Sequence, residues 1–187
     1  IDAVNANAKV IDGQTQYPHM HGDEGWYSYT PAPFSAGALE TWYWSQSSQD
    51  RERVQDNAWV RYLAGDDAGY AERLLEGDLE RLRAKVEGLR ADTSTPDTRL
   101  SDDMNGINPA TIEGLNQLML GALPVGRSCH TLHARLRYFD ADRRRAGLPL
   151  DVGALVESMT GDSVTVSLVN LSPVQARTVV LQSGGYG

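Results

Sequence analysis

The sequence has few of the features that mark specialised classes of protein. A single cysteine, Cys129, stands among 187 residues, so no disulfide can form within the chain. The apolar runs are far shorter than a helix needs to cross a bilayer, which argues against a membrane partner and predicts a soluble chain. We find no internal repeat and no low-complexity segment. These absences are typical of an ordinary globular protein.

The chain also has fewer basic residues than acidic ones. The 25 acidic residues outnumber the 17 basic ones, and the formal net charge is -8. A surplus of negative charge repels phosphate backbones, so the composition argues against a nucleic-acid partner and favours neutral or cationic ones. A secreted or periplasmic location stays open.

The two ends of the sequence suggest that this chain is one piece of something larger. It starts at Ile1 instead of a methionine and stops on Ser-Gly-Gly-Tyr-Gly directly after a strand-like run. We therefore expect a processed chain whose partner is another chain or the remainder of a precursor. The few strands predicted below support this expectation, because a small sheet leaves an edge unpaired.

Helical spacing dominates the first two thirds of the chain. Residues 1–16 suggest a short helix or an ordered arm, and the apolar spacing then predicts helices over 35–47, 50–64, 70–90 and 109–121. The clearest pattern recurs at intervals of four and three residues, at Leu75, Leu79, Leu82, Val86 and Leu89. A two-stranded coiled coil uses the same spacing, but the pattern is short, which favours a helix packed in a bundle.

Alternating spacing takes over near the C-terminus. It predicts strands over 132–139, 163–170 and 176–182, while the spacing over 151–159 predicts a further helix. The expected fold class is α+β, with a mainly helical region over 1–122 and a small antiparallel β unit over 123–187.

The most informative stretch runs over residues 17–44. It holds three of the four tryptophans, two of the four histidines and an adjacent acid pair, set among glycines and prolines. Aromatic walls, titratable groups and a loop backbone are what a ligand site needs, so we predict an aromatic-rich loop that lines a cleft.

Two sets of residues in this stretch suggest a saccharide site. Asp23, Glu24 and His21 are the candidate catalytic groups, because a carboxyl among aromatic rings can work as a general acid. The candidate substrate-binding residues are aromatic side chains that can stack on a sugar ring, namely Trp26, Tyr27, Tyr29 and Trp42. The alternative is a structural loop with solvated acids and aromatics in the core.

A metal site is the second chemical possibility. His19 and His21 would point to one face of a strand, and Glu24 could complete the ligand set for a divalent metal. The order of these residues departs from the cupin metal motif, whose glutamate comes later after the second histidine. The cofactor therefore stays unknown, with a divalent metal as one hypothesis.

The chain as a whole resembles the C-terminal part of large bacterial carbohydrate-active enzymes. The segment VTVSLVNLSPVQARTVVLQSGG is similar to the closing hairpin of their β-sandwich domains, which follow a helical barrel. The resemblance covers residues 19–187 in the order of the expected elements, but only 163–182 in the amino-acid sequence itself. It matches no catalytic motif. It implies a larger architecture of helical barrel plus β-sandwich.

Three functions follow from these observations. The resemblance and the aromatic stretch favour a fragment or subunit of a carbohydrate-directed hydrolase or lyase. The second hypothesis is a non-catalytic subunit or interaction module whose aromatic stretch docks onto a partner chain, because exposed Trp and Tyr also dominate binding hot spots. The third is a metal-dependent enzyme that uses the two histidines.

Overall fold

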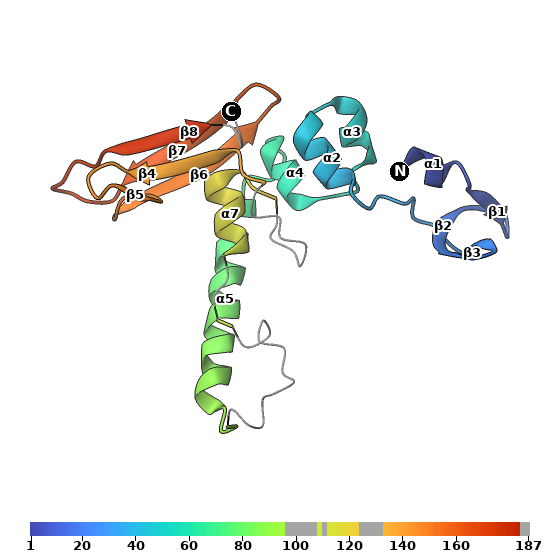
Figure 1. Cartoon of the computed structure of the whole chain (residues 1–187), viewed down its shortest axis with the longest axis horizontal. Helices are drawn as coiled ribbons and strands as arrows, with labels where there is room; N and C mark the ends of the chain where they lie inside the picture. The colour runs from blue at the N-terminus through green and yellow to red at the C-terminus, as the bar shows by residue number, and fades with distance from the viewer. Residues whose placement is uncertain (96–107, 110–111, 124–132, 184–187) are drawn as a thin grey trace. The chain divides into compact units, whose positions relative to one another are not determined.

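The chain divides into two compact units, which are described separately. The computed structural model describes residues 1–95, 108–109, 112–123 and 133–183. Residues 1–57 form the N-terminal unit and residues 58–187 the C-terminal unit (Figure 1). Helices and antiparallel sheets are both present, which confirms the α+β class. The division falls inside the region predicted as one helical domain, 1–122.

The N-terminal unit combines a small sheet with three short helices. Its elements are α1 (Asp2–Asn5), β1 (Lys9–Ile11), β2 (Gln14–Gly22), β3 (Gly25–Thr30), α2 (Ala38–Ser45) and α3 (Ser48–Arg53). The three strands are antiparallel in the order β1-β2-β3. The short helix suggested within 1–16 is α1, and the helix predicted over 35–47 corresponds to α2. The rest of the predicted arm and the first part of the predicted loop over 17–44 are wrong, because strands occupy residues 9–11, 14–22 and 25–30.

The turn between β1 and β2 explains the first of these errors. Asp12 and Gly13 both have positive φ, at 50° and 77°. Two successive residues with positive φ match the right-handed twist of a hairpin, so this dipeptide joins two paired strands. The sequence predicted only a turn at this dipeptide. The pairing of β1 with β2 shows that the turn belongs to a hairpin. Pro18 lies within β2, next to a shift in register that accommodates a residue without an N–H.

The helices of the C-terminal unit follow the sequence pattern more closely. They are α4 (Ala58–Leu63), α5 (Tyr70–Ala91) and α7 (Glu113–Leu120). The prediction over 70–90 is confirmed by α5, and α7 ends at Gly121, whose φ of 59° suits the stop. The single helix predicted over 50–64 is instead split between α3 and α4. The start predicted for the last helix at residue 109 is wrong, because Pro109 is not helical and α7 begins at Glu113. Residues 110–111 lie outside the described residues.

Five strands complete the C-terminal unit: β4 (Leu136–Asp140), β5 (Arg145–Ala146), β6 (Val152–Met159), β7 (Val164–Asn170) and β8 (Val179–Ser183). They form two antiparallel sheets, in the orders β5-β4-β8 and β6-β7. The strand predictions over 163–170 and 176–182 correspond to β7 and β8. The prediction over 132–139 corresponds to β4, although residue 132 lies outside the described residues.

The helix predicted over 151–159 is wrong. This segment is β6, which pairs with β7 from Val152 opposite Asn170 to Met159 opposite Val164. An apolar run of this length fits either period, and β-branched residues and a partner strand decide it. A register irregularity between Val156 and Ser158 further blurs the alternation that would have identified a strand.

The core of the C-terminal unit joins its helices to its sheets. Side chains buried there include Trp59, Val60, Leu63, Leu118, Leu123, Leu136 and Val156. Two tyrosine hydroxyls tie the layers together, each donating a 2.8 Å hydrogen bond: Tyr62 to the carbonyl of Val156, and Tyr138 to the carbonyl of Met119. Burial raises the pKa of both phenols, that of Tyr138 to about 12, so both donors are neutral near pH 7.

Replacing Tyr62 with phenylalanine is expected to lower the free energy of unfolding by about 1 to 2 kcal/mol, because the buried carbonyl of Val156 loses its side-chain donor. Urea unfolding followed by circular dichroism measures this loss. Tyr27→Phe is the control, since that hydroxyl is exposed and reaches only the sulfur of Met20. Equal stabilities for the two variants would contradict the prediction.

Within the described ranges, none of the helices has the length and apolar content that crossing a membrane requires.

Candidate binding site on the aromatic hairpin

The candidate residues gather on the hairpin formed by β2 and β3. The two strands pair from Tyr17 opposite Thr30 to Gly22 opposite Gly25. Asp23 and Glu24 form the turn between them, and the φ of 105° at Gly25 is a value that favours glycine. The acid pair therefore stands at the tip of the hairpin, with both residues exposed.

Two irregularities interrupt the regular pairing of the hairpin. The register passes over His19 on β2 and over Tyr27 on β3. An extra residue of this kind bends a strand and re-aims the side chains next to it. This explains why the alternation expected for a regular hairpin does not show in the sequence.

One face of the hairpin carries His21 and Trp26. These cross-strand neighbours meet edge to face, with ring centroids 4.8 Å apart and ring planes at 81°. Such a geometry is the favoured one between aromatic rings. The pair gives this face a half-buried indole next to an exposed imidazole.

The opposite face carries Tyr27. A Cβ added to Gly22 would lie 3.3 Å from Cε1 of Tyr27, so the ring covers the backbone of that glycine. The hydroxyl of Tyr27 donates to the sulfur of Met20 at 3.7 Å. Gly22 and Met20 flank His21 along β2, and neighbours in a strand point to opposite faces. Trp26 and Tyr27 therefore lie on different faces.

The base of the hairpin holds Tyr29. The ammonium group of Lys9, on β1, lies 4.7 Å from the centroid of the Tyr29 ring, a cation–π contact that links the first strand to the third. Contacts of this kind at exposed sites contribute roughly 0.5–1 kcal/mol. Tyr29 is thus part of the packing of the sheet as well as a candidate binding residue.

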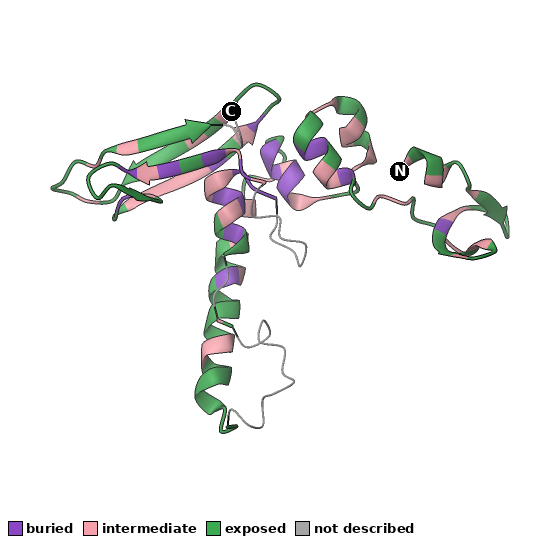
Figure 2. Ribbon diagram, viewed as in Figure 1, coloured by how far each residue is buried: buried purple, intermediate pink, exposed green. Residues whose placement is uncertain are grey.

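The sheet buries almost nothing. Of the residues in β1, β2 and β3, only Pro18 is buried, and Figure 2 shows the strands mainly in the colours of exposed and intermediate residues. Tyr27 is 65% exposed, Met20 47% and Val10 73%. Three strands usually need a hydrophobic face packed on something to be stable. This sheet presents its apolar and aromatic side chains to the surroundings instead.

The predicted catalytic groups do not line the cavity that is found among the described residues of the N-terminal unit. Asp23, Glu24 and His21 are all exposed. A cavity of about 250 Å³ in the N-terminal unit is lined by other residues, among them Asn5, Phe34 and Arg53.

Two further site predictions need correction. Trp42 does not join the aromatic residues of the hairpin, because it lies on α2 and is only 7% exposed. The predicted metal site at His19, His21 and Glu24 is not formed, since no three His, Cys, Asp or Glu side chains in the described part of the chain lie where they could hold an ion.

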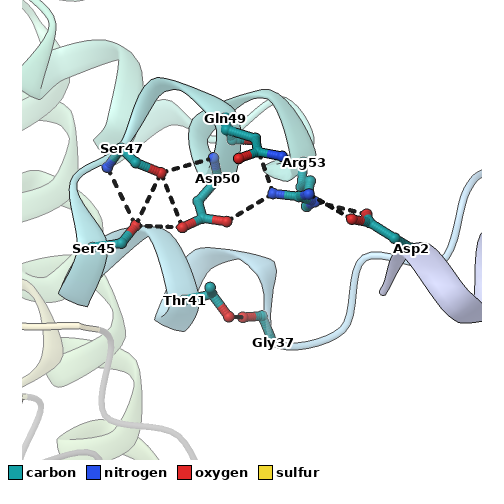
Figure 3. Close-up of polar contacts among 8 residues, drawn as sticks. All are labelled: Asp2, Gly37, Thr41, Ser45, Ser47, Gln49, Asp50 and Arg53. Carbon is teal, nitrogen blue, oxygen red and sulfur yellow. Dashed lines mark hydrogen bonds and ion pairs between the residues drawn. The ribbon is translucent and has the colours of Figure 1, made fainter.

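A polar clamp at the other end of this unit was not foreseen (Figure 3). Arg53, at the end of α3, donates from Nε and Nη2 to the two carboxylate oxygens of Asp2, at 2.7 and 2.5 Å. Its Nη1 donates to Asp50 at 2.7 Å. The hydrogen bond from Arg53 lowers the pKa of Asp2. The hydroxyls of Ser45 and Ser47 are the main reason that the pKa of Asp50 is lowered.

The clamp fixes α1, from which the hairpin sheet begins, to α3. A second contact supports it: Asn5 donates to the carbonyl of Phe34 at 2.9 Å and accepts from the amide of Phe34 at 2.8 Å. These partners are 29 or more residues apart, so no local pattern predicts them. The one local signal was Ser47 three residues before Asp50, a helix cap that the structure contains.

Comparison with known proteins adds one match. A family described as "Domain of unknown function (DUF8034)" matches residues 54–116, which cover α4, α5 and the start of α7. No curated protein and no solved structure matches the chain. The aromatic hairpin lies outside the matched residues.

Proposed function

We propose that the N-terminal unit is a non-catalytic binding module that docks through its aromatic hairpin onto a polypeptide partner, either another chain or the remainder of a precursor. The observation that carries the proposal is the distribution of aromatic rings over both faces of a sheet that buries only Pro18. Trp and Tyr dominate the hot spots of protein interfaces, because they bury a large area at a small cost in conformational entropy.

The two-faced arrangement favours a polypeptide over a sugar. A saccharide stacks on aromatic rings that share one surface, whereas Trp26 and Tyr27 lie on opposite faces. A hairpin with rings on both sides fits into a groove between two walls, and a folded polypeptide provides such walls. The acid pair at the tip, Asp23 and Glu24, would then meet cationic side chains, as the negative charge of the chain favours.

A second proposal keeps the saccharide hypothesis. Tyr27 is 65% exposed and offers one ring face on which a pyranose could stack. In a carbohydrate-directed hydrolase or lyase, Glu24 would act together with a carboxyl supplied by another part of the assembly, because two residues adjacent in sequence seldom flank one scissile bond. Its test is turnover: Glu24→Gln should then lower the rate by about 10²–10⁴-fold.

The docking proposal is tested first by crosslinking. A photoreactive phenylalanine analogue in place of Tyr27, in the chain expressed in its natural cell, is expected to crosslink to one defined polypeptide segment. The same analogue at the exposed Gln49 on α3 is the matched control. Crosslinking at both positions to the same broad set of proteins would contradict a specific docking site.

Affinity for the crosslinked segment gives the second test. Trp26→Ala and Tyr27→Ala are each expected to weaken binding about 30-fold or more, as the loss of a hot-spot aromatic does. Thr41→Ala, an exposed position on α2, should leave the affinity unchanged. If an oligosaccharide binds to the isolated chain and Tyr27→Ala abolishes that binding, while no polypeptide is crosslinked, the second proposal replaces the first.

A further inference from the structure

A stripe of leucines on α5 has no cover in the described part of the chain. Leu75 is 38% exposed, Leu79 49%, Leu82 36% and Leu89 36%. Together with Val86 they recur every three or four residues over four helical turns. Figure 2 shows exposed residues along most of this helix. The stripe was expected to be packed inside a bundle, but the described helices that contact α5, which are α4 and α7, leave it partly exposed.

The neighbouring helix α7 packs on a different row of α5. Tyr70 donates to Gln117 of α7 at 3.0 Å. A Cβ added to Gly114 of α7 would lie 3.0 Å from Cγ of Leu74 and 2.3 Å from Oδ2 of Asp78. Tyr70, Leu74 and Asp78 are spaced by four residues and form the row that faces α7.

The first leucines of the stripe each come one residue after a member of that row. Leu75 comes after Leu74, and Leu79 after Asp78, so the stripe lies about 100° around the helix axis from the row that faces α7. The packing of α7 therefore leaves the stripe open. A stripe with this spacing is the surface that a second helix covers in a two-stranded pair.

The net charge of α5 changes sign halfway along the helix. Acidic residues outnumber basic ones in the first half, which carries Glu72, Arg73, Glu76, Asp78 and Glu80. Basic residues outnumber acidic ones in the second half, which carries Arg81, Arg83, Lys85, Glu87 and Arg90. A parallel neighbour of the same sequence would set acid beside acid and base beside base. An antiparallel neighbour would set the acidic half of each helix beside the basic half of the other.

We infer that α5 is a self-association surface, on which a second copy of this chain packs its own α5 in antiparallel orientation. The leucine stripes meet in the middle, and Glu76 of each copy faces Arg90 of the other. This inference concerns the C-terminal unit and does not depend on the hairpin. A two-fold axis at the centre of the contact makes each attractive pair occur twice.

Sedimentation velocity over a concentration series tests the inference on the complete chain. The parent is expected to form a dimer whose dissociation constant rises with salt, since the flanking pairs are exposed. Leu79→Glu should weaken the dimer about tenfold or more, because it places a charge where the dimer would bury a leucine. Leu150→Glu is the matched control, a leucine 57% exposed outside α5, and should leave the dimer intact.

Orientation is tested with charge reversal. Glu76→Arg alone should weaken the dimer about three- to tenfold, and adding Arg90→Glu to the same chain should restore it. Circular dichroism of each variant verifies that α5 stays helical. A parent that stays monomeric throughout the series would overturn the inference, as would a dimer that Leu79→Glu does not weaken. Failure of the double reversal to restore affinity would overturn the antiparallel arrangement.

Discussion

Replacing Trp59 with alanine is expected to lower the free energy of unfolding of the C-terminal unit by about 3–5 kcal/mol. Trp59 is the largest of the fully buried side chains among the described residues, at 2% exposure, and lies on α4, a helix that contacts strand β6. Its removal loses apolar burial and leaves a cavity that the surrounding side chains fill only in part. A small domain has a total stability of about 5–15 kcal/mol, so the loss is a large fraction.

A second tryptophan serves as the matched control. Trp44 lies on α2 and is 46% exposed, so Trp44→Ala removes the same side chain from a site that is half solvated. Its expected cost is below about 1 kcal/mol. Guanidinium unfolding followed by far-ultraviolet circular dichroism compares the two. Losses of equal size would mean that Trp59 is not a central core residue.

Replacing Gly114 with valine should destabilise the crossing of α5 and α7 by about 3 kcal/mol, at the upper end of the usual cost of overpacking. The added Cβ alone would come within 2.3 Å of Oδ2 of Asp78 and 3.0 Å of Cγ of Leu74. Asp78 is only 6% exposed and forms an ion pair with Arg81, so its carboxylate has little room to move away. Valine adds two methyl groups beyond that Cβ.

Gly77 on α5 provides the control for this substitution. A Cβ there would have no heavy atom within 4 Å. Because valine has a slightly better helix propensity than glycine, Gly77→Val should raise stability by a few tenths of a kcal/mol, about the difference between the two propensities. Asp78→Ala in the Gly114→Val background should recover part of the loss. A Gly114→Val variant as stable as Gly77→Val would show that the two helices can separate without cost.

Local patterns predicted the long elements well. The four-three spacing of apolar residues identified α5 to within a residue of its end, and Gly121 marked the stop of α7, because backbone geometry at these points depends on neighbours within one or two turns. The alternating runs over 163–170 and 176–182 likewise correspond to β7 and β8. The α+β class follows from these elements.

The wrong secondary-structure predictions lie where the apolar residues fit both helical and alternating spacing, or where pairing with another strand determines the structure. The segment 151–159 has apolar residues that satisfy helical spacing, yet β7 supplies a ladder of backbone hydrogen bonds along it. Residues 17–30 contain a proline, two glycines and two histidines that suggest a loop, yet β2 and β3 pair with each other there and β1 pairs with the other edge of β2. Hydrogen bonding between strands is a tertiary interaction, and no local window contains it.

The sequence by itself determined which residues carry the chemistry of the aromatic stretch, since His21, Trp26 and Tyr27 do gather on one hairpin. Only the tertiary structure decided how they are arranged. Pairing of the two strands sets Trp26 beside His21 on one face and Tyr27 beside Met20 and Gly22 on the other, and burial on α2 removes Trp42 from the set. The physical reason is that side-chain direction depends on pairing register, whereas the identity of a residue does not.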